Sequence, residues 1–97
     1  MTSESPVRCE IIYRGRVQGV GFRYTTRMTV TNYAVTGYVI NLRDGSVRLV
    51  LEGARPTVSA AIRSVADAMG SQITDQAESW GAATGEFPTF DIRHERP

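Results

Sequence analysis

The 97-residue sequence predicts an α+β domain in which two helices cover one face of an antiparallel sheet. Three features predict it: strand-like alternation near the N-terminus, an Asp-Gly turn between two apolar runs, and helix-like periodicity in two segments. The expected order is strand, helix, strand, strand, helix, strand, with a weak extra strand before the last. This is the βαββαβ order of a ferredoxin-like sandwich with a four- or five-stranded sheet.

The first strand and the first helix flank a glycine-rich stretch. Residues 7–14 largely alternate between apolar and charged side chains, which is typical of a half-buried strand. Residues 22–33 are rich in threonine, whose β-branched side chain favours a strand. Phe22, Thr26, Val30 and Tyr33 nevertheless share one helical face, so we expect a helix there.

The remaining elements follow from turn residues and periodicity. Asp44-Gly45 separates extended runs at 35–42 and 46–52, and this dipeptide is a strong hairpin signal. Pro56 suits the first turn of a second helix, and Gly70 suits its end. The sequence that follows has no clear period. It allows a weak strand at about 76–80 and predicts a final strand at 89–95.

From the length and composition of the chain, we expect one small cytoplasmic domain. We expect residues 1–6 to be a frayed polar tail rather than a signal peptide, and residues 7–97 to form a single domain, expected to be a monomer. No run approaches the roughly 20 apolar residues that a membrane-spanning helix needs. Cys9 is the only cysteine, so no internal disulfide can form and the chain fits a reducing compartment.

Charge and side-chain chemistry narrow the function classes. The net charge of +1 and the lack of an RNA-recognition aromatic motif argue against a nucleic-acid partner. All eleven basic residues are arginines, which excludes lysine chemistry and leaves guanidinium, a good bidentate ligand for phosphate. One cysteine and one histidine do not make a usual zinc site, and we expect no metal and no other cofactor.

Gly15, Gly19 and Gly21 lie between the first strand and the first helix, with a spacing that matches no nucleotide-binding motif. Successive amides at such a turn can bind an anion, and the helix N-terminus adds partial positive charge. Arg23 in the first helical turn opposes the helix dipole, which a bound anion would explain. A tight turn beside a solvated Arg23 explains the pattern equally well, so the residues alone leave both possibilities open.

Two phrases resemble the signatures of the acylphosphatase family. The first is Gly15-Arg16-Val17-Gln18-Gly19-Val20-Gly21-Phe22-Arg23, and the second is Gly37-Tyr38-Val39-Ile40-Asn41-Leu42-Arg43-Asp44-Gly45-Ser46-Val47. Glu52-Gly53 follows at the expected distance, and the two phrases have the expected order and spacing. The similarity is strong over about residues 8–53 and weak from there to residue 93.

The resemblance implies the activity and the site. Acylphosphatases hydrolyse the mixed anhydride of a carboxylic acid and phosphate without a metal, so the implied partner is a small acyl phosphate. Arg23 is then expected to hold the phosphate and Asn41 to position the attacking water. The implied phosphate-binding loop consists of Arg16, Val17, Gln18, Gly19, Val20 and Gly21, acting mainly through backbone amides.

Other interpretations remain beside this one. The chain could be a non-catalytic anion-binding module, and the same module occurs at the N-terminus of hydrogenase-maturation carbamoyltransferases, for which 97 residues are too few. Asn41 could simply cap the hairpin. We expect the side chains of Arg16 and Gln18 to make no functional contacts, and His94 to be solvated or structural.

Overall fold

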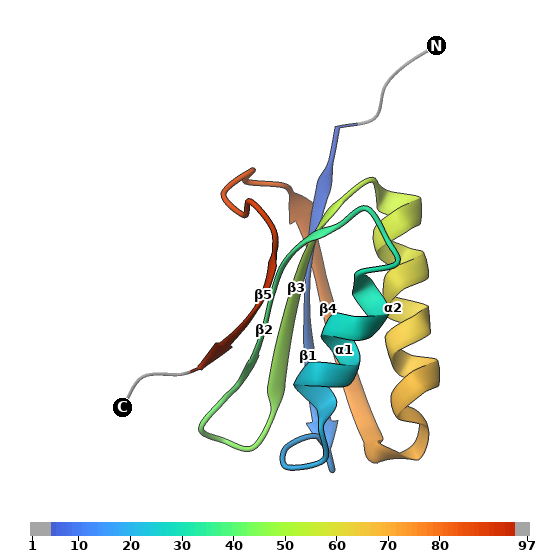
Figure 1. Ribbon diagram of the computed structural model, residues 1–97, viewed down its shortest axis with the longest axis vertical. Coiled ribbons are helices and arrows are strands. Elements are labelled where there is room, and N and C mark those ends of the chain that lie inside the picture. Colours follow the sequence, from blue (N-terminus) through green and yellow to red (C-terminus); the bar gives the residue numbers. More distant parts are fainter. Residues whose placement is uncertain (1–4, 95–97) are drawn as a thin grey trace.

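The computed structural model describes residues 5–94. Its elements are β1 (Val7–Gly15), α1 (Phe22–Val30), β2 (Thr36–Asn41), β3 (Val47–Gly53), α2 (Arg55–Met69), a 3₁₀ turn (Gly70–Gln72), β4 (Ile73–Ala82) and β5 (Phe90–His94). Five strands form one sheet in the order β4-β1-β3-β2-β5, and both helices lie on the same face (Figure 1). The ferredoxin-like α+β fold is therefore confirmed. Most of the expected frayed tail, at residues 1–4, lies outside the described residues.

One strand pairing differs from the antiparallel prediction. β5 runs parallel to β2, with Gly37 opposite Phe90 and Asn41 opposite His94, so the sheet is mixed. The cause is the segment 83–89, which carries the chain from β4 at one edge of the sheet to the opposite edge beside β2. The chain therefore enters β5 in the direction of β2, and β5 ends beside the end of β2.

β4 is longer than the weak strand predicted at 76–80. It pairs antiparallel with β1 over most of its length, from Val7 opposite Ala82 to Gly15 opposite Ile73. Most of its side chains are exposed because it is an edge strand. An edge strand with a solvated face carries little apolar alternation. The sequence pattern therefore indicated only the middle of β4.

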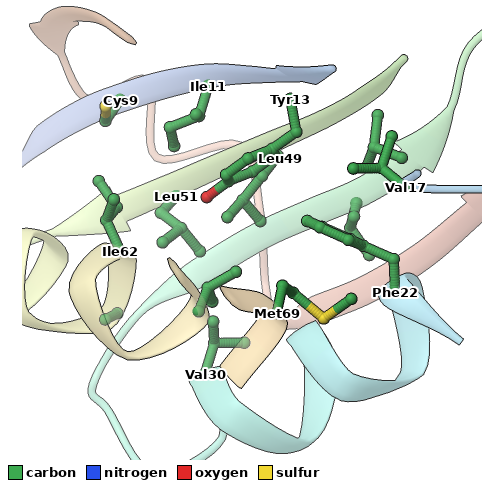
Figure 2. Packing of buried hydrophobic residues seen from close by; sticks show 14 of the residues in the cluster. Cys9, Ile11, Tyr13, Val17, Phe22, Val30, Leu49, Leu51, Ile62 and Met69 are labelled. Carbon is green, nitrogen blue, oxygen red and sulfur yellow. The ribbon is translucent and has the colours of Figure 1, made fainter. Parts of the chain in front are cut away.

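The core lies between the inner face of the sheet and the two helices (Figure 2). α1 is helical as predicted, although it ends at Val30 rather than near Tyr33. Burial of its apolar stripe outweighs the low helix propensity of its threonines. Just past the helix, the Thr31 hydroxyl donates to the Met28 carbonyl at 2.8 Å, a bond that satisfies one of the terminal carbonyls.

Glu52, in β3, forms hydrogen bonds with the segment 83–89 that leads to β5. Its side chain is buried, and its carboxylate accepts hydrogen bonds from the amides of Thr84 and Gly85 at 2.9 and 3.0 Å. The Thr84 hydroxyl and the Arg8 guanidinium, at 2.9 and 3.6 Å, complete the set. Burial alone would raise the pKa of the Glu52 carboxyl, but these contacts outweigh it and lower the pKa.

We expect Glu52→Gln to lower the free energy of unfolding by about 1–3 kcal/mol at pH 7, because the amide supplies one acceptor oxygen fewer. A lowered pKa in the folded state stabilises the protein above the ordinary glutamate value of about 4.3, and this stabilisation disappears as the pH falls through the folded-state pKa. Urea unfolding at pH 7 and pH 3 should therefore show the difference between variant and wild type shrinking with acid. Glu86→Gln, which removes an exposed partner of the same arginine, is the matched control and should change little. An equal loss in both variants would contradict this role for Glu52.

Candidate functional site

Three segments meet at one end of the sheet. They are the loop at residues 16–21 after β1, the turn at residues 42–46 between β2 and β3, and the end of β5. Figure 1 shows the loop and the turn at the same end of the molecule. Parallel pairing adds the end of β5, because His94 lies opposite Asn41.

Two glycines shape the loop, and the amides from Val17 to Gly21 are unpaired among the described residues. Gly19 and Gly21 have φ angles of 75° and 77°, in the left-handed region that glycine adopts without strain. Within residues 5–94, no group accepts a hydrogen bond from the five amides of Val17 to Gly21. α1 begins directly after them with no side-chain cap and no acidic residue in its first turn. Unpaired amides next to a helix N-terminus form a site that favours an anion.

The amide of Arg16 is not part of this set. It donates to the Gln72 carbonyl at 2.8 Å, which ties the start of the loop to the residue before β4. The Arg16 side chain is exposed. The Arg16 amide is therefore engaged within the protein, and phosphate binding by the stretch from Arg16 to Gly21 stays a prediction.

A cavity of about 140 Å³ brings the predicted site residues together. It is lined by Val17, Gly19, Gly21, Phe22, Arg23, Tyr24 and Asn41. Arg16, Gln18 and Val20 were predicted with this group but do not line the cavity. A larger hollow of about 430 Å³ between the helices is lined only by uncharged side chains and offers no cation for a phosphate.

Gln18 connects the loop to the hairpin. Its side-chain amide nitrogen donates to the carbonyls of Leu42 and Ser46 at 2.7 and 2.8 Å. This contact is structural: it bridges the loop to the turn that follows Asn41. A glutamine in a glycine-rich loop gave no sign of this contact, because the turn is more than twenty residues away in sequence.

Asn41 ends β2 between two strands, opposite Val47 of β3 and His94 of β5. Its side-chain oxygen Oδ1 is buried and has no hydrogen-bond partner within the described chain. The turn is capped instead by Asp44, whose Oδ1 accepts from the Ser46 amide at 2.9 Å. The Ser46 hydroxyl donates to the same oxygen, and the hydrogen bonds from this hydroxyl and from the Ser46 amide lower the pKa of the Asp44 carboxyl. A capping role therefore does not account for Asn41.

Arg23 lies in the first turn of α1 and reaches toward β5. Its Nη1 lies 3.0 Å from Nδ1 of His94 and 3.5 Å from the Arg93 carbonyl oxygen. His94 was expected to be solvated or structural; it is exposed, and it is in contact with the predicted phosphate ligand. Only the parallel pairing of β5 with β2 places it there, and the sequence pattern carries no signal for that pairing.

Other chemistry finds little support. Burial raises the pKa of the Cys9 thiol to about 12, so this cysteine is no nucleophile at neutral pH. Across residues 5–94, no three histidine, cysteine or acidic side chains gather as metal ligands. In the same residues, no helix is both long and apolar enough to cross a membrane.

Comparison with known proteins is consistent with this geometry. The acylphosphatase family model matches residues 9–92. An acylphosphatase from a Synechococcus species is 39% identical over 87 residues, which are 90% of this chain and 93% of that protein. The crystal structure of acylphosphatase from Bacillus subtilis superimposes with a TM-score of 0.82 at 31% identity, covering 90% of this chain and 98% of the other. Full-length HypF, in a phosphate- and nucleotide-bound form, matches 95% of this chain with 12% of its own length, at 25% identity and a TM-score of 0.78.

Proposed function

The chain belongs to the acylphosphatase family and is an acylphosphatase, and from this premise we propose that the cavity beside Arg23 is its catalytic site. The observation that carries the proposal is that Arg23, Asn41 and the loop residues Val17, Gly19 and Gly21 line one cavity. The amides of this loop have no acceptor among residues 5–94. The substrate is a small acyl phosphate. Its phosphate is held by the amides of Val17–Gly21 and by the Arg23 guanidinium, and Asn41 positions the water.

The anion site fits the charge of the substrate. A phosphoryl group presents several oxygens, and amides that converge on one point can bond to them without rearranging. The guanidinium of Arg23 adds a planar pair of donors and a full positive charge. Because the loop is held by Gln18 and by the strands around it, these donors are oriented before the substrate arrives.

The water site rests on Asn41. Its Oδ1 is buried and has no partner in the part of the chain that the structure describes, so it can accept a hydrogen bond from a water, and the same side chain can also donate one. The water oxygen bonds to phosphorus, the bond from phosphorus to the acyl oxygen breaks, and the carboxylate leaves. An amide is too weak a base to take the water proton, so the proton passes to an oxygen of the phosphoryl group. Since a carboxylate is a good leaving group, positioning and charge stabilisation supply most of the acceleration.

Hydrolysis of benzoyl phosphate by the purified protein tests the proposal. We expect turnover that continues in the presence of EDTA and is inhibited competitively by inorganic phosphate. Phosphate binding without turnover would instead support the non-catalytic anion-binding module. A large loss of rate with EDTA would contradict the metal-free mechanism.

Gln18 supplies a further prediction about the same site. We expect Gln18→Leu to lower kcat/KM for benzoyl phosphate by about tenfold or more, because the loop loses its two bonds to the hairpin that carries Asn41 and small displacements at a reacting centre cost rate. Gln76→Leu makes the same chemical change on the edge strand β4 and is the matched control. Steady-state kinetics of both variants, with their melting temperatures, provide the check. Equal kinetics for the two would show that the bridge has no catalytic consequence.

A further inference from the structure

His94 is the only histidine of the chain, and the fold delivers it to the rim of the proposed site. It is the last residue of β5, it lies opposite Asn41 in the parallel pairing, and its Nδ1 lies 3.0 Å from Nη1 of Arg23. An arginine guanidinium can only donate hydrogen bonds. The ring nitrogen Nδ1 must therefore be the acceptor, which requires the tautomer that carries its proton on Nε2.

This contact leaves the rest of the guanidinium available. Arginine has five N–H groups, and the bonds to His94 and to the Arg93 carbonyl involve Nη1 alone. The pair formed by Nε and Nη2 remains for two phosphate oxygens. His94 thus holds one side of the arginine fork, and the other side can face the cavity.

We propose that His94 is a positioning residue that holds Arg23 ready for the phosphate of the substrate; this rests on the proposed function. A long arginine side chain loses rotamer freedom when it binds a ligand, and a partner that orders it beforehand lowers that cost. Arg23 contacts the phosphate both before and during the reaction. The cost of ordering Arg23 arises when the substrate binds, before Arg23 stabilises the charge of the transition state. Loss of this ordering therefore raises KM and leaves kcat nearly unchanged.

Three substitutions at position 94 test the inference. His94→Phe keeps the ring shape and removes the acceptor. His94→Asn places its Oδ1 the same number of bonds from Cβ as Nδ1, whereas His94→Gln moves the acceptor one bond further out. We expect His94→Phe to raise KM for benzoyl phosphate and Ki for inorganic phosphate about three- to tenfold, with kcat within about twofold. His94→Asn should keep all three values within about twofold of wild type, and His94→Gln should resemble the phenylalanine variant.

The pattern of rescue separates positioning from a purely structural role. If all three variants change KM equally, or if none does, the inference is wrong. A fall in kcat with KM unchanged would also overturn it, since it would place His94 in the chemical step. Melting temperatures show whether any variant has lost its fold. The NMR measurement described next uses the wild-type protein, so it does not depend on the stability of the variants.

In the wild-type protein, ¹⁵N NMR of the single histidine at pH 8 reports the tautomer directly. A proton on Nε2 and an acceptor at Nδ1 support the contact, and a proton on Nδ1 contradicts it. The NMR result and the phosphate affinity of the variants, measured by calorimetry, do not depend on turnover. If benzoyl phosphate is not hydrolysed but His94→Phe still weakens phosphate binding, the proposed catalysis fails while the positioning role stands. If hydrolysis proceeds and His94→Phe matches wild type, only the positioning role fails.

Discussion

Arg23→Ala is expected to reduce kcat/KM for benzoyl phosphate by about a thousandfold or more. Loss of an arginine that stabilises phosphoryl charge costs about 10³–10⁵ in other phosphoryl-transfer sites, and this chain has no lysine that could substitute. The amides of Val17–Gly21 remain in place, so part of the phosphate affinity should survive. Steady-state kinetics and calorimetric titration with inorganic phosphate measure the two effects separately.

Two further arginine variants make this result specific. Arg23→Lys keeps a positive charge but has no planar fork, and we expect it to recover only part of the lost rate. Arg27→Ala removes an exposed arginine one turn further along α1, where it stacks on the Tyr24 ring at 5.4 Å from the ring centroid. This matched control should keep activity close to wild type. Similar losses at both arginines would mean that only the general positive charge of α1 matters.

Much of the fold was predictable because its signals are local. The Asp-Gly turn, the alternation of β1 and the stripe of α2 each depend on neighbouring residues, and all three elements formed where expected. The glycine-rich loop was also recognisable from residues adjacent in sequence. Its two left-handed glycines now have a structural reason, since they form a turn whose five amides have no acceptor among residues 5–94.

The features that could not be predicted from the sequence depend on contacts between residues that are far apart in the chain. β5 joins β2 only because residues 83–89 cross the sheet, and this crossing is held by Glu52, more than thirty residues earlier. The contacts of Gln18 with the hairpin and of His94 with Arg23 have the same origin. Each of these side chains has several ordinary roles in a small domain, and only the tertiary fold shows which of them it performs.

Asn41→Ala should separate binding from turnover. Without the side-chain amide, the attacking water has no fixed partner, and we expect kcat to fall about 10²- to 10³-fold. The loop amides and Arg23 are untouched, so the affinity for inorganic phosphate should stay within about twofold of wild type. Kinetics on benzoyl phosphate and phosphate titration of the same preparation give both values. Full activity in this variant would rule out the water-positioning role.

The free energy of unfolding of the Asn41→Ala variant provides a second, independent test of the role of Asn41. Because Oδ1 of Asn41 is buried without a partner among residues 5–94, this part of the folded chain gains no internal hydrogen bond from it. Asn41→Ala should therefore leave the free energy of unfolding unchanged or raise it by up to about 1 kcal/mol. A residue kept for structure would show the opposite combination, a lower melting temperature with activity retained. Reduced turnover in a protein of equal or greater stability is the pattern of a group that is retained for catalysis although the fold does not need it.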